Sequence, residues 1–316
     1  YYNRGHSDLS DADYDALFVQ LRKLEQANPE LVTPDSPTQR VGAPLPKGSS
    51  FATAPHLAPM GSIESLMAAD EVREFAARAR KLLALPDGEP LVWSCEPKLD
   101  GASANLLYEH GVLVRGLSRG DGTQGEDLTQ NLKTIRNLPL RLHGAGPFPA
   151  RIEIRGEVIM SKAGFAALQE REETSSEGQF RNARNTTAGT LKLQDPRVVK
   201  RRPLDFFAFA VGHVEGVEFA THTALREQLR AWGFALAEPF AVAADVEQVL
   251  AFRDDLERRR DELPYELDGT VAKVDRFDWQ QQLGRTSRTP RWALAYKFAP
   301  RIGTTRVLAI GAQVGR

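Results

Sequence analysis

The sequence is poor in cysteine, lacks any long hydrophobic run and carries no excess of either charge. Its single cysteine, Cys95, excludes an internal disulfide, and no Cys-x-x-Cys or paired His/Cys spacing indicates structural zinc. No apolar stretch approaches the length of a membrane span, and the first residues do not form a secretory signal peptide. We therefore expect a soluble, monomeric protein of a reducing compartment, the cytoplasm, with no membrane partner.

The balance of charge narrows the ways in which the chain can bind nucleic acid. There are 41 basic and 42 acidic residues, giving a net charge of -1, so no basic footprint covers the whole surface. Any binding of phosphate must come from local clusters of cations. A length of 316 residues allows about two domains, and a hydrophobic fraction of 41% is sufficient for real cores.

Changes of pattern divide the chain into three parts. Residues 1–50 indicate a small helical domain, because Ser10 is an N-cap residue before an acidic turn and apolar spacing continues to about Ala27. Residues 51–300 show mixed helix and strand patterns. Residues 301–316 alternate like the first strand of a further domain, and the chain opens without methionine. We expect a piece of a longer protein.

One stretch, from Cys95 to Gly101, holds a lysine and two carboxylates within five residues. It follows an apolar segment, residues 90–93, that we expect to be a strand. A lysine has an ordinary pKa of about 10.4 and becomes a nucleophile only where neighbouring cations and partial burial favour loss of its proton. Lys98 is therefore a candidate nucleophile. The competing interpretation is a solvated lysine beside an Asp-Gly turn, because such short matches arise by chance.

Hydrophobic periodicity predicts the main elements of the central part. Helices are expected at residues 70–85, 162–171, 223–232 and 245–261. Strands are expected at residues 102–108, 112–118, 151–159, 204–211 and 291–298, and a turn followed by a strand is expected at residues 268–274. The strand at 151–159 alternates charged and apolar residues, as expected when one face is buried. The last two helices have ordinary amphipathic spacing, and we assign them no chemistry.

Two polar segments each allow two interpretations. The glycine-rich loop at residues 119–127 is not a phosphate loop of the Gly-x-x-x-x-Gly-Lys-Ser/Thr type, because no lysine and hydroxyl residue close it. It predicts a tight surface loop in which Arg119 has the best claim to chemistry. Residues 181–192 are cationic and rich in hydroxyl groups, which suits either phosphate oxygens or a solvated helix face.

Charged side chains within apolar strands point to one cleft. Lys273 and Lys297 each lie among apolar neighbours, a setting in which a lysine usually just faces solvent. Two such lysines, together with Lys98 and with Glu96, Glu157 and Arg119, favour a shared site instead.

In their order along the chain, these segments resemble the N-terminal part of bacterial NAD-dependent DNA ligases. The resemblance rests on residues 11–15, residues 33–42, the Lys98 motif, the Arg119 loop, the Glu157 strand and the two lysine strands. It implies an α+β nucleotidyltransferase fold, like that of DNA ligases and mRNA capping enzymes, with antiparallel sheets lining an ATP or NAD cleft. A small helical domain would precede this domain, and an OB-fold would follow it.

The resemblance implies a reaction and its participants. Lys98 would attack the α-phosphate of NAD, forming lysyl-AMP and releasing nicotinamide mononucleotide (NMN), the first step in sealing nicks between a 5'-phosphate and a 3'-hydroxyl in duplex DNA. Lys273 and Lys297 would face the α-phosphate as further catalytic residues. A magnesium ion, held chiefly by phosphate oxygens and water rather than by a set of protein ligands, would share the work.

The resemblance also implies a set of binding residues. Those for the NMN half of NAD are Tyr1, Tyr2, Asp11, Tyr14 and Asp15. Those for the adenylate are Ser62, Ile63, Glu96, Asp100, Arg119, Glu157, Phe209, Val271, Lys273 and Lys297. Within this set Glu96 would contact the adenine amino group, Arg119 and Glu157 the ribose, and Phe209 and Val271 the two faces of the base. Arg184 and Lys192 would contact nicked DNA, weakly in a chain of this net charge.

Four residues depart from the pattern of the family, and one of them is Ile63, which replaces the usual leucine after Ser62. Tyr2 replaces a frequent histidine, Phe209 a frequent tyrosine and Lys192 a frequent arginine. The first two keep a ring and change its polar group, and the third grips phosphate with less geometric constraint than a guanidinium.

Two other functions stay open. An ATP-dependent ligase or capping enzyme shares the lysine motif but lacks residues 11–15, and the choice between NAD and ATP as AMP donor decides between them. A DNA-binding module without turnover would use the cations of the later segments, namely Arg181, Arg184, Lys192, Lys200, Arg201 and Arg202.

Overall fold

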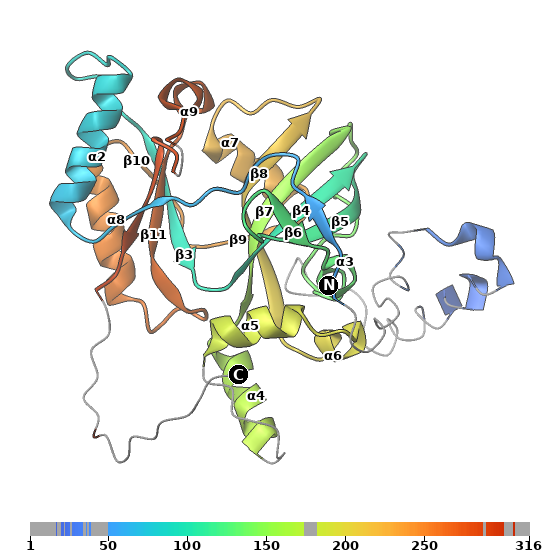
Figure 1. Cartoon of the computed structure of the whole chain (residues 1–316). Coiled ribbons are helices and arrows are strands. Elements are labelled where there is room, and N and C mark those ends of the chain that lie inside the picture. The colour runs from blue at the N-terminus through green and yellow to red at the C-terminus, as the bar shows by residue number, and fades with distance from the viewer. Residues whose placement is uncertain are drawn as a thin grey trace.

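The part of the chain that the computed structural model describes is built around two five-stranded sheets (Figure 1). The described residues are 50–173, 182–286, 289–299 and 306, with 17, 20, 21, 23–25, 27–33, 36 and 38 from the N-terminal part. In that part residues 17, 20, 21, 23–25 and 27 are helical, within the predicted helix, and η1 (Pro29–Leu31) follows. The segment 307–316, expected to begin a further domain, lies outside the described residues.

The first sheet carries the Lys98 motif. Its strands run in the order β10 (Ala241–Ala243), β3 (Trp93–Leu99), β11 (Leu267–Val274), β12 (Ala293–Lys297) and β2 (Glu64–Leu66). All neighbours are antiparallel except β12 and β2, which are parallel. The strand expected at residues 90–93 is wrong. The strand starts at Trp93, because the residues from there onward form the ladder with β11, so Lys98 lies inside the strand near its end.

The second sheet is also mainly antiparallel. Its strands run in the order β5 (Val112–Ser118), β4 (Ala102–Glu109), β7 (Arg151–Met160), β8 (Leu204–Glu215) and β9 (Ala235–Leu236), with only β8 and β9 parallel. A small separate pair joins β1 (Thr53–Pro55) to β6 (Gln124–Glu126). The α+β fold class with antiparallel sheets is therefore confirmed.

Two helices cover the first sheet and bury one core. α2 (Ala69–Leu82) and α8 (Val246–Arg258) lie side by side on its outer face (Figure 1). Phe75 of α2 packs with Trp93 of β3 in this core, with ring centroids 6.2 Å apart. The apolar spacing that predicts this helix includes Leu82, but Leu82, at the end of the helix, is 52% exposed.

The second sheet has a core of its own. α7 (His222–Ala231) and α3 (Thr129–Leu132) pack on it, and Leu106, Ile154 and Phe206 from three neighbouring strands are fully buried. The alternation predicted for residues 151–159 holds except at Glu153, because the apolar positions are buried and the other charged positions are only half-buried. The carboxylate of Glu153 is buried and accepts hydrogen bonds from the N–H groups of Leu57 and Ala58.

The remaining helices surround the sheets. They are α4 (Lys162–Glu173), α5 (Ala183–Leu191), α6 (Pro196–Lys200) and α9 (Phe277–Leu283). In Figure 1, α4, α5 and α6 lie together below the second sheet. No helix among the described residues is long and apolar enough to cross a membrane.

The chain crosses from one sheet to the other directly after the lysine. β3 belongs to the first sheet and β4 to the second, and only Asp100 and Gly101 separate them. A Cβ atom on Gly101 would lie 2.2 Å from the Val158 carbonyl oxygen, so only glycine allows this close approach to β7. The crossing places Lys98 at the junction of the two sheets.

Candidate active site

A cavity of about 590 Å³ lies between the two sheets and takes lining residues from both. It brings together residues that the sequence predicted from distant segments, namely Ser62, Ile63, Glu96, Lys98, Arg119, Glu157, Arg184, Phe209, Val271, Lys273 and Lys297. A second hollow of about 530 Å³ lies beside α4 and α6 and contains none of the predicted nucleotide-binding residues. The first cavity is therefore the candidate site.

Strand pairing explains why the charged side chains share this cavity. In the ladder between β3 and β11, Lys98 pairs with Gly269 and Glu96 pairs with Val271. Because side chains alternate along a strand, positions two residues apart lie on one face. Glu96 and Lys98 thus point the same way, beside Val271 and its second neighbour Lys273.

Two lysines converge on one carboxylate at the Lys98 end of the cavity. The Nζ atom of Lys98 lies 2.9 Å from one carboxylate oxygen of Asp268, and that of Lys297 lies 3.4 Å from the other. Gly269 pairs with both lysines, one on each neighbouring strand, and its missing side chain leaves room between them. The negative charge of Asp268 offsets the repulsion between the two ammonium groups. The same two groups would attract an incoming phosphate.

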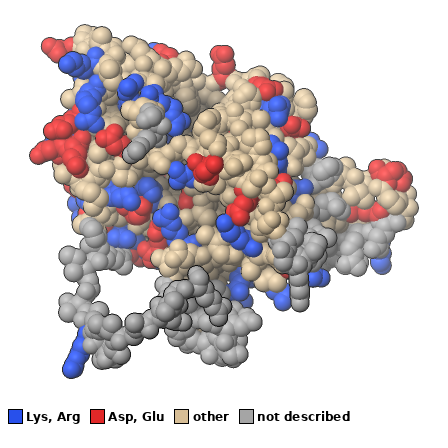
Figure 2. Space-filling model, viewed as in Figure 1, with Lys and Arg blue, Asp and Glu red and all other residues tan. Residues whose placement is uncertain are grey.

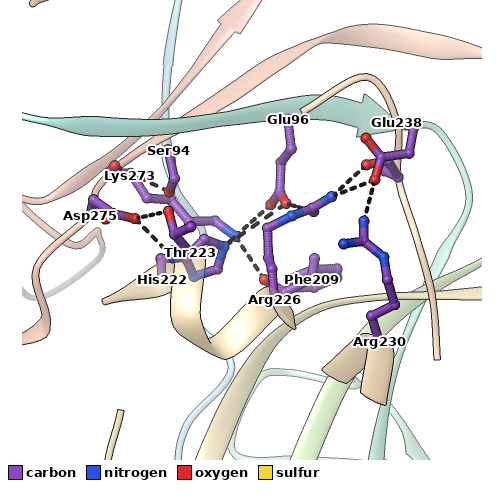
Figure 3. A network of polar contacts seen from close by, with 11 residues as sticks. Ser94, Glu96, Phe209, His222, Thr223, Arg226, Arg230, Glu238, Lys273 and Asp275 are labelled. Atoms are coloured by element: carbon purple, nitrogen blue, oxygen red, sulfur yellow. Dashed lines mark hydrogen bonds and ion pairs between the residues drawn. The ribbon is translucent and has the colours of Figure 1, made fainter. Parts of the chain in front are cut away.

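The other end of the cavity holds a buried polar network (Figure 3). Glu96 is 3% exposed, and its two carboxylate oxygens accept hydrogen bonds from Lys273 and Arg226. His222 lies 3.9 Å from the same carboxylate. Burial alone would raise the pKa of Glu96, but the charge of Lys273 and the neighbouring His222 and Arg226 outweigh it and lower the pKa below its ordinary value. Glu96 is therefore an anion at neutral pH.

Lys273 lies at this end rather than beside Lys98. Its ammonium group contacts Glu96, the Phe209 carbonyl at 2.8 Å and His222 Nε2 at 3.0 Å. An ammonium group has three N–H donors, so these contacts use all of them. Burial, and then the charge of Lys273, lower the pKa of His222, which is consistent with a neutral imidazole accepting this hydrogen bond. The sequence had placed Lys273 at the α-phosphate with Lys297, and the structure separates the two.

Apolar walls face each other between the two charged ends. Phe209 comes from β8 of the second sheet and Val271 from β11 of the first, and both side chains are half-buried and line the cavity. A planar ring bound between them would have one face on each sheet, with Glu96 at its edge.

The pKa of a second carboxylate, Glu157 of β7, is shifted in the opposite direction from that of Glu96. Burial raises its pKa to about 7, against a hydrogen bond from Ser103 and the charges of Lys98 and Arg184. The Ser103 hydroxyl donates to it at 2.7 Å. Glu157 therefore changes its charge near neutral pH, whereas Glu96 stays ionised.

The predicted loop also reaches the cavity. Arg119 donates to the Ser62 hydroxyl at 2.7 Å, and its own carbonyl lies 3.1 Å from a ring nitrogen of His56. Asp121 folds the loop by accepting hydrogen bonds from the N–H groups of Thr123 and Gln124, at 2.8 and 2.9 Å. Arg119 is thus held at the rim by a short, internally bonded loop.

Comparison with known proteins identifies the family. The family described as NAD-dependent DNA ligase adenylation domain matches residues 48–301, and the one described as DNA ligase-like, N-terminal NAD+-binding domain matches residues 1–42. The chain belongs to the NAD-dependent DNA ligase family. The resemblance drawn from the sequence is confirmed.

Relatives within the ligase family match along the whole chain. The DNA ligases of Trichlorobacter lovleyi and Geobacter metallireducens are 47% and 45% identical over 100% of this chain, which covers 46% and 47% of their length. The chain thus spans about half the length of the curated relatives it matches. A solved archaeal ATP-dependent RNA ligase has 14% identity and a TM-score of 0.41, covering 76% of this chain and 48% of that one, a likeness too slight to support a conclusion.

The two residues expected to contact DNA already have acidic partners. Arg184 of α5 lies 2.7 Å from a carboxylate oxygen of Asp100, which is itself a predicted nucleotide-binding residue beside the cavity. Lys192, just after α5, lies 2.6 Å from Glu126 and does not line the cavity. Both cations are exposed, so a phosphate group can compete for them.

Some predictions fall on residues that are not described. The NMN-binding set of Tyr1, Tyr2, Asp11, Tyr14 and Asp15 lies outside the described residues. Among those that are described, no group of three or more His, Cys, Asp or Glu side chains could hold a metal ion. The carboxylates of the cavity therefore do not fit a magnesium site made by protein alone.

Sequence analysis missed three residues of the site. Asp268 was read as part of a turn, but it lies within β11 at an irregularity of the ladder. His222 and Arg226 belong to a helix to which no chemistry was assigned. Their signal was readable, because both occupy the buried stripe of α7 together with Leu225 and Leu229. A charged residue at such a position needs a buried partner.

Proposed function

We propose that this chain transfers AMP from NAD to Lys98 and releases NMN, and that this is the first step in sealing nicked duplex DNA. The Lys98 ammonium group first loses a proton to solvent; its neutral Nζ then attacks the α-phosphorus, the bond to the NMN phosphate breaks, and the nitrogen gives up a second proton to solvent. The observation that carries the proposal is the junction itself, where Lys98 and Lys297 share Asp268 at one end of a cavity whose other end holds an ionised, buried Glu96.

The cavity suggests how the adenylate lies. Its base would fit between Phe209 and Val271, with the adenine amino group donating to Glu96, which is acceptor-only when ionised. We propose that Lys273 lies at the edge of the base, where it neutralises the charge of Glu96. Lys98 and Lys297 would then contact the α-phosphate. Pre-placed cations stabilise the charge that develops on phosphate oxygens without rearranging.

The ribose would lie between the two ends. Glu157 and Arg119 are placed to contact its hydroxyl groups, with Ser62 orienting Arg119. Ile63 and Asp100 complete this part of the proposed adenylate site, and Asp100 also holds Arg184.

The remaining assignments rest on family membership. Tyr1, Tyr2, Asp11, Tyr14 and Asp15 would bind the NMN half, within the matched N-terminal NAD+-binding domain. Magnesium would arrive on the phosphate oxygens of NAD and supply positive charge there. We further propose that the protein acts as a monomer in the cytoplasm and that Arg184 and Lys192 contact nicked DNA.

The first test is the intact mass of the purified chain after incubation with NAD and magnesium, with ATP in a parallel sample. We expect the mass to rise by one AMP with NAD only. Lys98→Ala should abolish this gain, because no other described lysine has the same place at the junction, whereas Lys81→Ala, on the exposed side of α2, should react normally.

Each other outcome has a defined meaning. A gain from ATP would favour the ATP-dependent alternative, and a gain that persists in Lys98→Ala would show that another residue is the nucleophile. If neither donor reacts, treatment with NMN followed by a second mass measurement shows whether the protein was already adenylated. Binding of nicked DNA without any adenylation would favour the DNA-binding module.

A further inference from the structure

Arg226 lies behind the proposed base-binding end of the cavity without lining it. Its side chain is 3% exposed, and the cavity-lining residues include Glu96 and Ala237 but not Arg226. The residue is therefore placed to act through Glu96 and not on a bound nucleotide directly.

The contacts of Arg226 fix its guanidinium on three sides. One nitrogen donates to Glu96 at 2.9 Å, and a second donates to the Ala237 carbonyl at 2.9 Å and to Glu238 at 3.2 Å. The guanidinium carbon lies 4.1 Å from the centre of the Phe240 ring. A planar fork held in this way has little freedom, so the carboxylate bonded to it is held in one orientation.

The start of α7 brings the guanidinium to this place. Asp275, directly after β11, accepts hydrogen bonds from the N–H and the hydroxyl of Thr223, at 2.9 and 2.8 Å. Arg226 follows His222 by one helical turn, so both side chains lie on the helix face toward Glu96 (Figure 3). α7 is thus anchored to the strand that carries Lys273.

Each oxygen of the buried Glu96 carboxylate has its own cation, because Lys273 donates to one and Arg226 donates to the other. Glu96 and Glu238 carry negative charge, and Arg226 and Lys273 carry positive charge, while Glu238 also has an exposed partner in Arg230 at 2.7 Å. Removing Arg226 leaves one oxygen of this buried carboxylate without its donor, which is strongly unfavourable. Glu96 would then have to turn or take up a proton.

We propose that Arg226 is a positioning residue that holds the Glu96 carboxylate as an acceptor and thereby makes the site select 6-aminopurine over 6-oxopurine dinucleotides. The inference rests on the proposed function, in which the base edge meets Glu96. Adenine presents an amino donor at position 6, whereas hypoxanthine presents a carbonyl acceptor. A fixed carboxylate accepts from the first and repels the second, whereas a protonated Glu96 can donate to the carbonyl and a Glu96 that has turned away no longer repels it.

The test compares NAD with nicotinamide hypoxanthine dinucleotide as donors, in the unchanged chain and in Arg226→Met. We measure kcat/KM for attachment of the nucleotide to the protein by intact mass. The unchanged chain should prefer NAD, and Arg226→Met should lower that preference about tenfold or more, as expected when a hydrogen bond to a buried charged group is lost.

Two variants serve as controls. Arg230→Met removes a guanidinium from the same helix that shares Glu238 but does not reach Glu96, so the preference should be unchanged. Arg226→Lys keeps the charge but loses the fork, and its preference should lie between those of the unchanged chain and Arg226→Met. Arg226→Lys also tests the proposal if Arg226→Met does not fold.

The proposal is overturned if Arg226→Met and Arg226→Lys each lower kcat/KM equally for both donors. A merely structural role would leave the ratio of the two kcat/KM values unchanged. Failure of the proposed function looks different, since the unchanged chain would then attach neither nucleotide. In that case the affinities for AMP and IMP, measured by calorimetry in the same proteins, still decide whether Arg226 sets the preference for the base.

Discussion

At the scale of single residues, burial acts in opposite directions on two carboxylates of one cavity. Glu96 is surrounded by cationic donors that outweigh its burial, and its pKa is lowered. Glu157 has weaker compensation, and burial raises its pKa to about 7. The same folded cavity therefore keeps one acceptor permanently charged and gives the other a titration near neutral pH.

We expect kcat/KM for NAD to rise with pH through about 7, because the ionised Glu157 accepts hydrogen bonds from ribose hydroxyls better than the acid does. Glu157→Gln should flatten this rise, and Glu74→Gln, exposed on α2, should retain it.

The stability of the fold should instead fall as the pH rises. Folded Glu157 keeps its proton where the unfolded chain has lost it, so its contribution to the free energy of unfolding falls between pH of about 4.5 and 7. A pH profile that is unchanged in Glu157→Gln would exclude this residue as its source.

At the scale of elements, two glycines should respond in opposite ways to the same substitution. Gly156 lies in β7, where a Cβ atom would be 2.5 Å from the Phe207 carbonyl oxygen and 2.2 Å from the Phe206 ring. Gly189 lies in α5, with nothing within 4 Å of an added Cβ. We expect Gly156→Ala to lower the free energy of unfolding by about 1–3 kcal/mol through overpacking. Gly189→Ala should raise it by up to about 1 kcal/mol through helix propensity.

Urea unfolding of both variants, followed by circular dichroism, measures this pair of effects. Because the same methyl group is added in each, the difference between them isolates the surroundings of the two positions. Equal effects in strand and helix would show that the close approach of β7 and β8 at Gly156 is not as described.

At the scale of the whole molecule, the small net charge limits the binding of DNA. Lysine and arginine are interspersed with acidic residues over the face shown in Figure 2, with no single large basic patch. Arg184 and Lys192 are the expected phosphate contacts, and each is already paired with a carboxylate. We expect weak, salt-sensitive binding of a nicked duplex by this chain, and only slow sealing.

The measurement is the dependence of the binding constant on salt. Arg184→Gln and Lys192→Gln should each reduce the slope of log K against log salt concentration by about 1, since each removes one phosphate contact. Lys81→Gln, on the exposed side of α2, should leave the slope unchanged. Slopes that do not change in either of the first two variants would place the DNA elsewhere on the protein.

The sequence by itself determined the long elements and the chemistry of the lysine motif. Period-two and period-3.6 patterns extend over enough residues in β4, β7 and α2 to identify each one, and the order of the motifs identified the family. Strands of two or three residues, such as β2, β9 and β10, are too short to show a reliable alternation of apolar and polar residues, and they were not predicted. Residues 90–93 were taken for a strand because an apolar run shows burial but not hydrogen bonding.

Only the tertiary structure decided which charges meet. Arg226 reaches Glu96 across 130 positions of sequence, and Asp268 reaches Lys98 across 170. A local pattern reports how deeply a residue is buried in its own element, but the partner lies on another element whose register is set by the packing of both sheets. Lys273 and Lys297 look alike in sequence, yet the ladders that join β11 to β3 and to β12 send one to Glu96 and the other to Asp268.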